Sequence, residues 1–116
     1  NITDIYNDIN YKYIQEFGIK IINEIINSYY DMSLIYFDKS DYNKSYKYSN
    51  FFTIHNINIP HISFIYIYSI YKIYYNNIPN YLIEDIKKNI KIAKCMLEFY
   101  KITELDNYCN IITNIT

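Results

Sequence analysis

The run HISFIYIYSIYKIYY, residues 61–75, decides the fold of this chain, because apolar side chains occupy both of its alternating faces. Such a run is typical of either a buried strand or a buried helix, and periodicity alone does not separate the two. Its many Ile and Tyr residues favour a strand on propensity alone. The segments on either side of the run therefore have to decide between the two structures.

The segment before this run has the composition of a loop followed by a strand. Residues 38–50 are mostly Asp, Lys, Ser, Tyr and Asn with almost no aliphatic side chains, which predicts an exposed loop. Residues 51–57, FFTIHNI, alternate and are rich in aromatic side chains, and Pro60 follows them closely. They predict a short strand, because Pro is tolerated at the end of a strand and not within its ladder.

The amino-terminal part predicts a strand and an amphipathic helix. Apolar and polar side chains alternate over residues 9–13, which is the period of a half-buried strand. Further apolar side chains then recur at intervals of three and four residues, which is the period of one helix face. They are Ile14, Phe17, Ile21, Ile25 and Tyr29. The sequence therefore predicts a helix that ends near Ser28.

The last third of the chain predicts two helices. Residues 81–100 place apolar side chains on one face and keep most charges off it, with Asn80 as the expected N-cap. We expect four side chains of this face to be buried in the core: Ile86, Ile90, Ala93 and Leu97. Thr103 then stands three residues before Asp106, the spacing of a capping box, and opens a helix over residues 103–112. Its expected buried stripe is Leu105, Tyr108, Cys109 and Ile112.

In this order of elements, three stretches resemble the BTB/POZ family, in the branch of elongin C and the Skp-type ubiquitin-ligase adaptors. The first is FFTIHNINIP at residues 51–60, and the second is YSIYKIYY at residues 68–75. The third begins with IPNYLIED at residue 78 and continues through IKIAKCMLEFYKITELDNYCNII to residue 112. The resemblance extends mainly over residues 51–115.

The resemblance implies an α+β fold in which a small sheet packs with a cluster of helices, as a single domain over residues 1–116. It also assigns the ambiguous run, because the family has a mid-domain helix followed by a short strand. Residues 61–70 are then a helix, and residues 72–75 are a strand.

The resemblance further implies a non-enzymatic adaptor that links a cullin-like scaffold to a substrate-receptor protein in a ubiquitin-ligase complex. The scaffold is expected on the sheet and on residues 33–48, and a receptor helix in a groove of the two C-terminal helices. The residues that the family relationship places in this groove are Met96, Phe99, Tyr100, Leu105, Tyr108 and Ile112.

Composition disfavours several other classes of function. The formal net charge of −1 lacks the basic excess that nucleic-acid binding uses, and no apolar stretch is long enough to span a membrane. With a single glycine, Gly18, the chain has no Walker, dinucleotide or nucleophile-elbow loop. The two cysteines, Cys95 and Cys109, suggest no disulfide framework, which favours the cytoplasm or nucleus. We expect no catalytic site, metal or cofactor, and we assign His55 and His61 to structural roles.

Two alternatives to the adaptor remain open. The chain has 17 Tyr and no Arg, Val or Trp, as codons of an AT-rich genome favour, yet part of the Tyr excess is typical of a partner-facing surface. One alternative is an accessory structural subunit of a large complex with obligate interfaces. The other is a virus-type helical binding protein resembling the Bcl-2 fold, in which residues 62–75 form a central buried helix.

Overall fold

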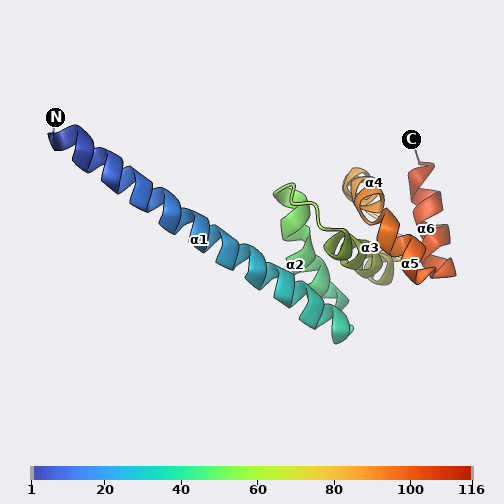
Figure 1. The fold of residues 1–116 in the computed structure, drawn as a ribbon. Coiled ribbons are helices and arrows are strands. Elements are labelled where there is room, and N and C mark those ends of the chain that lie inside the picture. The colour runs from blue at the N-terminus through green and yellow to red at the C-terminus, as the bar shows by residue number, and fades with distance from the viewer. Residues whose placement is uncertain (1, 116) are drawn as a thin grey trace.

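The computed structural model describes the backbone of residues 2–115 and the side chains of residues 12, 13 and 15–115. Throughout this range the chain is helical and forms no strand. The elements are α1 (Ile2–Asp38), α2 (Tyr42–Ile54), α3 (Pro60–Tyr74), η1 (Asn80–Leu82), α4 (Ile83–Ile92), α5 (Lys94–Tyr100) and α6 (Thr103–Thr113). Figure 1 shows α1 as a long rod that projects from a bundle of the other helices.

The run that decides the fold is the central helix, α3. Pro60 stands in its first turn, where the missing backbone N–H costs nothing, and all residues from Ile62 to Ile67 are buried. The helix contacts each of the other α-helices, which explains why its sequence is apolar all round. It ends at Tyr75, whose φ of 48° lies in the left-handed region. The helix predicted over residues 61–70 is confirmed, and the strand predicted over residues 72–75 is wrong.

The expected loop over residues 38–50 and the strand over residues 51–57 are replaced by α2 and its C-terminal turn. Asp41 caps α2 by accepting a hydrogen bond from the backbone N–H of Lys44 at 3.2 Å. Ser45 and Ser49 are buried although serine is a polar residue. Their burial is tolerated because their hydroxyls donate to carbonyls of their own helix. Ser45 also bonds the hydroxyl of Ser69 on α3, with 2.6 Å between the two oxygens.

The α+β, BTB/POZ-like fold with a small sheet is therefore wrong for this chain. Each segment predicted as a strand lies wholly or partly in a helix: residues 9–13 in α1, residues 51–54 in α2 and residues 72–74 in α3. Over residues 51–54 the alternation is overridden because Phe52 is buried against neighbouring helices.

The C-terminal helices are close to their predicted positions, with one interruption. The helix expected over residues 81–100 is divided into η1, α4 and α5, with a break at Ala93 (φ −85°, ψ 4°). Asn80 is the first residue of η1 and not its N-cap, which is Pro79, so the predicted cap at Asn80 is wrong. Ile86 and Ala93 are buried as expected, whereas Ile90 and Leu97 are only partly buried.

The last helix, α6, confirms the prediction for residues 103–112. Its residue before the first turn is Ile102, and no side chain caps it, so the predicted capping box is wrong. Its expected stripe is buried: Leu105, Tyr108, Cys109 and Ile112. This stripe packs on α3, where the ring of Tyr71 meets the ring of Tyr108 edge-on at 4.8 Å between centroids.

Helix α1 extends beyond the predicted end near Ser28 and belongs to the bundle only over its C-terminal half. Its side chains from Ile26 to Phe37 that face the bundle pack on α2 and α3. The N-terminal half has no helix beside it, as Figure 1 shows. The molecule therefore measures 65 × 33 × 26 Å, with the projecting half of α1 accounting for much of the longest dimension.

Candidate protein-binding surface

An apolar face of α1 continues past the end of α2 into the projecting half of the helix. Among the described side chains of α1, the first that packs in the core, counting from the N-terminus, is Ile26. Before it, Ile25 is 43% exposed, Ile22 is 55% exposed and Phe17 is 55% exposed. Ile21 is also exposed and lies on the same face by the 3.6-residue period. We call Phe17, Ile21, Ile22 and Ile25 the α1 stripe.

A groove adjoins the α1 stripe where α2 ends. It has a volume of about 350 Å³ and is lined by Ile22, Ile25, Ile26, Phe51, His55 and Ile57. Phe51 is held there by stacking on Tyr29 of α1, with 4.0 Å between the ring centroids. The loop after α2 is fixed by the backbone N–H of Ile57, which donates to the carbonyl of Phe52 at 2.9 Å. The groove is thus formed by fixed parts of α1, α2 and the loop after α2, and its apolar walls face solvent.

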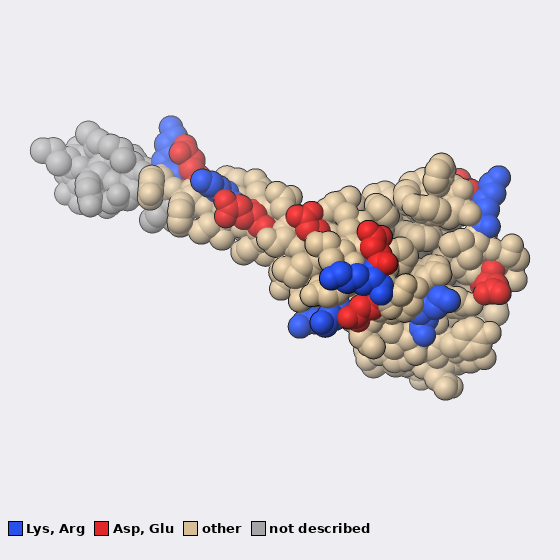
Figure 2. Space-filling view, turned by 90° about the horizontal axis from the view of Figure 1, so that it is seen from below, with Lys and Arg blue, Asp and Glu red and all other residues tan. Residues whose placement is uncertain are grey.

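The opposite face of the projecting half carries charges of alternating sign. Lys12, Glu16, Lys20 and Glu24 follow one another at four-residue intervals and are all exposed. Figure 2 shows blue and red side chains along one edge of the projecting helix and uncharged side chains along the other. These charges cancel over residues 12–24, and the same side of the helix also exposes Tyr13 and Ile19.

The residues predicted to line a partner-binding groove on the C-terminal helices fall into two groups. Leu105 and Ile112 are fully buried and Tyr108 is 8% exposed, so these three serve the core of the isolated chain. Phe99 is 77% exposed and Tyr100 is 44% exposed, and Met96 is partly buried. Only the α5 members of the predicted set are thus accessible to another molecule.

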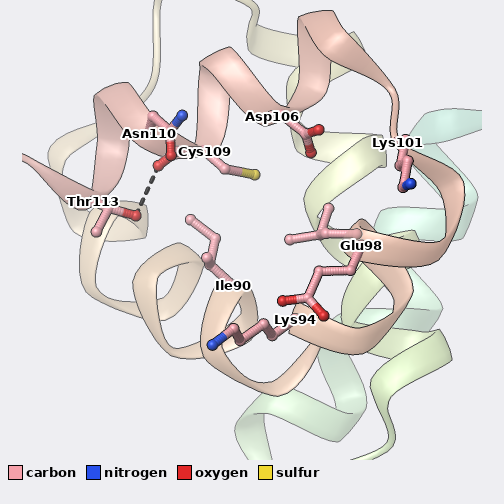
Figure 3. Close-up of a pocket in the computed structure, with 9 residues that line it drawn as sticks. Ile90, Lys94, Glu98, Lys101, Asp106, Cys109, Asn110 and Thr113 are labelled. Atoms are coloured by element: carbon pink, nitrogen blue, oxygen red, sulfur yellow. Dashed lines mark hydrogen bonds between the residues drawn. The ribbon is translucent and has the colours of Figure 1, made fainter.

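A groove does lie between α4, α5 and α6, but none of the six predicted residues lines it. It has a volume of about 460 Å³, and Figure 3 shows Ile90 and Cys109 pointing into it from facing helices. Charged side chains stand around it: Lys94, Glu98, Lys101 and Asp106. Burial, with a smaller contribution from Asp106, raises the pKa of the Cys109 thiol to about 12, so the sulfur is a neutral apolar group at neutral pH.

The described residues offer no arrangement for metal or thiolate chemistry. No group of three His, Cys, Asp or Glu side chains among them converges in a way that could hold a metal ion. Cys95 is exposed and Cys109 is buried, and both are free thiols. The ring of His55 lies against Phe51 at 4.5 Å between centroids, as part of the α1–α2 groove. Among the same residues, no helix is both long and apolar enough to cross a membrane.

The α1 stripe is a candidate binding surface that the sequence predicts only in part. The spacing of Phe17, Ile21 and Ile25 predicted the helix and its apolar face. It did not predict that the face is left uncovered, because nothing in the sequence says that α2 ends at Ile54. The missing signal was the start of α2 at Asp41, a good N-cap residue inside the segment that was predicted as a loop.

Comparison of the chain with protein-family models, with curated proteins and with solved structures finds no match. The central buried helix expected in the Bcl-2-like alternative is present as α3, but no relative connects the chain with that fold. The functional conclusion therefore rests on the surface itself.

Proposed function

We propose that the chain is a non-enzymatic protein-binding adaptor that holds a helix of another protein chain against the projecting half of α1. One observation carries this proposal. Phe17, Ile22 and Ile25 expose a continuous apolar stripe beside an apolar groove at the end of α2. Exposed apolar surface that is continuous and bordered by charges marks interaction sites, since water-exposed apolar area carries a free-energy cost that a partner removes.

A helix is the partner element that fits this surface. Over its C-terminal half, α1 packs α2 along a face with three- and four-residue spacing, and the α1 stripe prolongs that face toward the N-terminus. A second helix laid along the stripe, in line with α2, meets the same ridges and grooves that α2 uses. The groove at Ile22, Phe51 and Ile57 then receives its end.

The charge on the polar face favours a protein over a lipid surface. Helices that lie on membranes carry an excess of Lys or Arg, which attracts anionic headgroups. Here Lys12 and Lys20 alternate with Glu16 and Glu24, so that residues 12–24 have no net charge. Electrostatic attraction to an anionic bilayer is absent, and apolar contact with a partner helix is the remaining driving force.

An adaptor needs a second surface, and α5 provides the best candidate at the other end of the molecule. Phe99 and Tyr100 are exposed there, and the groove between α4, α5 and α6 adjoins them. Ordered aromatic side chains of this kind dominate interface energies. A cullin-like scaffold and a receptor helix as the two partners stay a prediction from the family resemblance alone.

The experiment compares the proteins retained from a source-cell extract by the wild-type chain and by two variants. Ile22→Asp places a charge in the α1 stripe, and Ile111→Asp is the matched control because Ile111 is 67% exposed on α6, away from the stripe. Proteins kept by wild type and Ile111→Asp but lost with Ile22→Asp support the proposal. Identical sets from all three chains contradict it, and binding to anionic vesicles that Ile22→Asp abolishes assigns the stripe to a membrane instead.

A further inference from the structure

The single glycine of the chain, Gly18, lies in the projecting half of α1. Gly18 is helical, and a glycine in a helix interior is less stable than an alanine because it loses more backbone entropy. A Cβ atom added at Gly18 meets no other atom within 4 Å. Nothing within the chain therefore requires a glycine at this position, whereas a second helix that crosses there closely would require one.

Four apolar positions on the Gly18 face of α1 are spaced symmetrically about Gly18. Ile22 and Ile25 follow it by four and seven residues, and the sequence has Ile14 and Tyr11 at the same separations before it. By the helical period these positions fall on the face of Gly18 itself. The side chains of residues 11 and 14 lie outside the described residues, so this symmetry is one of sequence positions along a described helical backbone. A pattern that reads alike in both directions matches an identical helix running the opposite way.

The charges have the opposite symmetry about the same residue. Lys12 and Glu24 lie six residues to either side of Gly18, and Glu16 and Lys20 lie two residues to either side. In an antiparallel pair each charge is level with an opposite charge, whereas in a parallel pair in register each is level with its own kind. Because these side chains are on the outer face, screening makes the effect small, and it favours an orientation more than it adds affinity.

We propose that the α1 stripe is occupied by a second copy of this chain, with the two α1 helices antiparallel and a two-fold axis passing beside Gly18. This deepens the proposed function and rests on it, since it names the protein that the stripe holds. A two-fold interface uses the same patch on both copies, which the symmetric spacing of residues 11, 14, 22 and 25 about Gly18 provides. The missing side chain at Gly18 lets the two helix axes approach closely at their crossing.

The arrangement also explains the groove at the end of α2. In a pair centred on Gly18, Ile22 and Ile25 of one copy lie beside the N-terminal part of α1 of the other copy. That part lies beside Phe51 and Ile57, which line the groove of the first copy. Because the pair has a two-fold axis, the groove of each copy is covered by the α1 helix of the other copy. The bundles point away from each other, and each keeps its exposed Phe99 and Tyr100 free for a further partner.

The first test is the mass of the purified full chain in solution, measured by light scattering or sedimentation over a series of concentrations. The wild-type chain is expected to rise from its monomer mass of 14.2 kDa to twice that mass. Ile22→Asp is expected to stay at the monomer mass with an unchanged helix signal in circular dichroism, and the exposed control Ile111→Asp to reach the doubled mass. A wild-type chain that stays monomeric overturns this inference while leaving a different partner for the stripe intact.

The second test determines the orientation by disulfide formation between copies in a Cys95→Ser background, since Cys95 is the exposed native thiol. In an antiparallel pair, residue 14 of one copy is level with residue 22 of the other, so a mixture of the Ile14→Cys and Ile22→Cys variants is expected to give mixed covalent dimers under mild oxidation. Ile22→Cys alone is expected to give none, because its two copies lie about eight residues, or about 12 Å, apart along an antiparallel pair. Covalent dimers from Ile22→Cys alone indicate a parallel pair, and the absence of dimers from the mixture excludes a crossing at Gly18; either result overturns the proposal.

Discussion

Two buried tyrosine hydroxyls, those of Tyr66 and Tyr108, have no hydrogen-bond partner among the described residues. Burial of a hydroxyl without a partner costs free energy, whereas the ring itself stabilises the core. At the residue scale, therefore, the sequence identifies the buried positions better than it identifies the chemistry that those positions need.

Tyr66→Phe is expected to leave the free energy of unfolding unchanged or to raise it by about 1 kcal/mol, since it removes only an unpaired buried hydroxyl. The Tyr66 side chain is 0% exposed, so the ring keeps all of its packing. Tyr71→Phe is the matched control, because the Tyr71 hydroxyl donates to a carboxylate oxygen of Glu104 at 3.3 Å. Urea melts of both variants provide the measurement. A loss of more than about 1 kcal/mol in Tyr66→Phe would show that its hydroxyl has a partner.

The buried thiol of Cys109 predicts a pH dependence on the alkaline side. Its pKa is raised from 9.0 to about 12, mainly by burial, so the folded chain keeps a proton that the unfolded chain loses. Stability is then fully present below pH 9.0 and falls between pH 9.0 and about 12, by at most about 1.4 kcal/mol per pH unit from this group.

The variant Cys109→Ala tests this dependence. It is expected to lose stability at neutral pH through the smaller side chain, yet to lose less of what remains as the pH rises above 9.0. Cys95→Ala, at an exposed position, should follow the wild-type curve. Denaturant melts at several alkaline pH values measure the slopes. Equal slopes for wild type and Cys109→Ala would mean that the thiol of Cys109 titrates normally in the folded chain.

At the scale of elements, the sequence predicts helices well where apolar and charged side chains separate into faces. α6 and the segment that forms α4 and α5 follow that pattern and lie where it predicts them. α2 does not follow it, because its buried face is built from Ser45, Ser49 and Phe52. Burial of a serine side chain is favourable only when its hydroxyl donates to a carbonyl of its own helix and a neighbouring helix packs closely on it. The amino-acid composition of a segment predicts neither condition.

Ser45→Val tests how closely α2 and α3 pack. The Ser45 hydroxyl lies 2.6 Å from that of Ser69, so a branched side chain has no room between the two helices. We expect Ser45→Val to lower the free energy of unfolding by about 1–3 kcal/mol through overpacking. Ser28→Val at an exposed site of α1 should change it by less than about 0.5 kcal/mol. Equal effects in thermal or urea melts would show that α2 does not approach α3 as closely as Ser45 and Ser69 indicate.

At the scale of the whole molecule, the radius of gyration of 18.7 Å is larger than the roughly 13 Å of a compact chain of this length. The excess comes from the projecting half of α1. The two core clusters, one centred on α3 with the C-terminal helices and one on α1, α2 and α3, both contact Phe37 and form a continuous interior. Helix lengths and directions determine which apolar faces pack against each other. The sequence pattern does not give these, so it could not predict that the α1 stripe is left uncovered.

Removal of residues 1–24 is therefore expected to leave the bundle folded. The core of α1 begins at Ile26, and no residue before it belongs to either core cluster of the described side chains. At concentrations where the full chain is monomeric, the truncated and full chains should have free energies of unfolding within about 1 kcal/mol, because little apolar area is lost. Their denaturant m-values should also be nearly equal, since m follows the surface exposed on unfolding and the projecting half buries little. A truncated chain that loses cooperative unfolding would instead show that residues 1–24 pack on the bundle, and that the stripe of Phe17, Ile22 and Ile25 is part of the core and not a surface for a second chain.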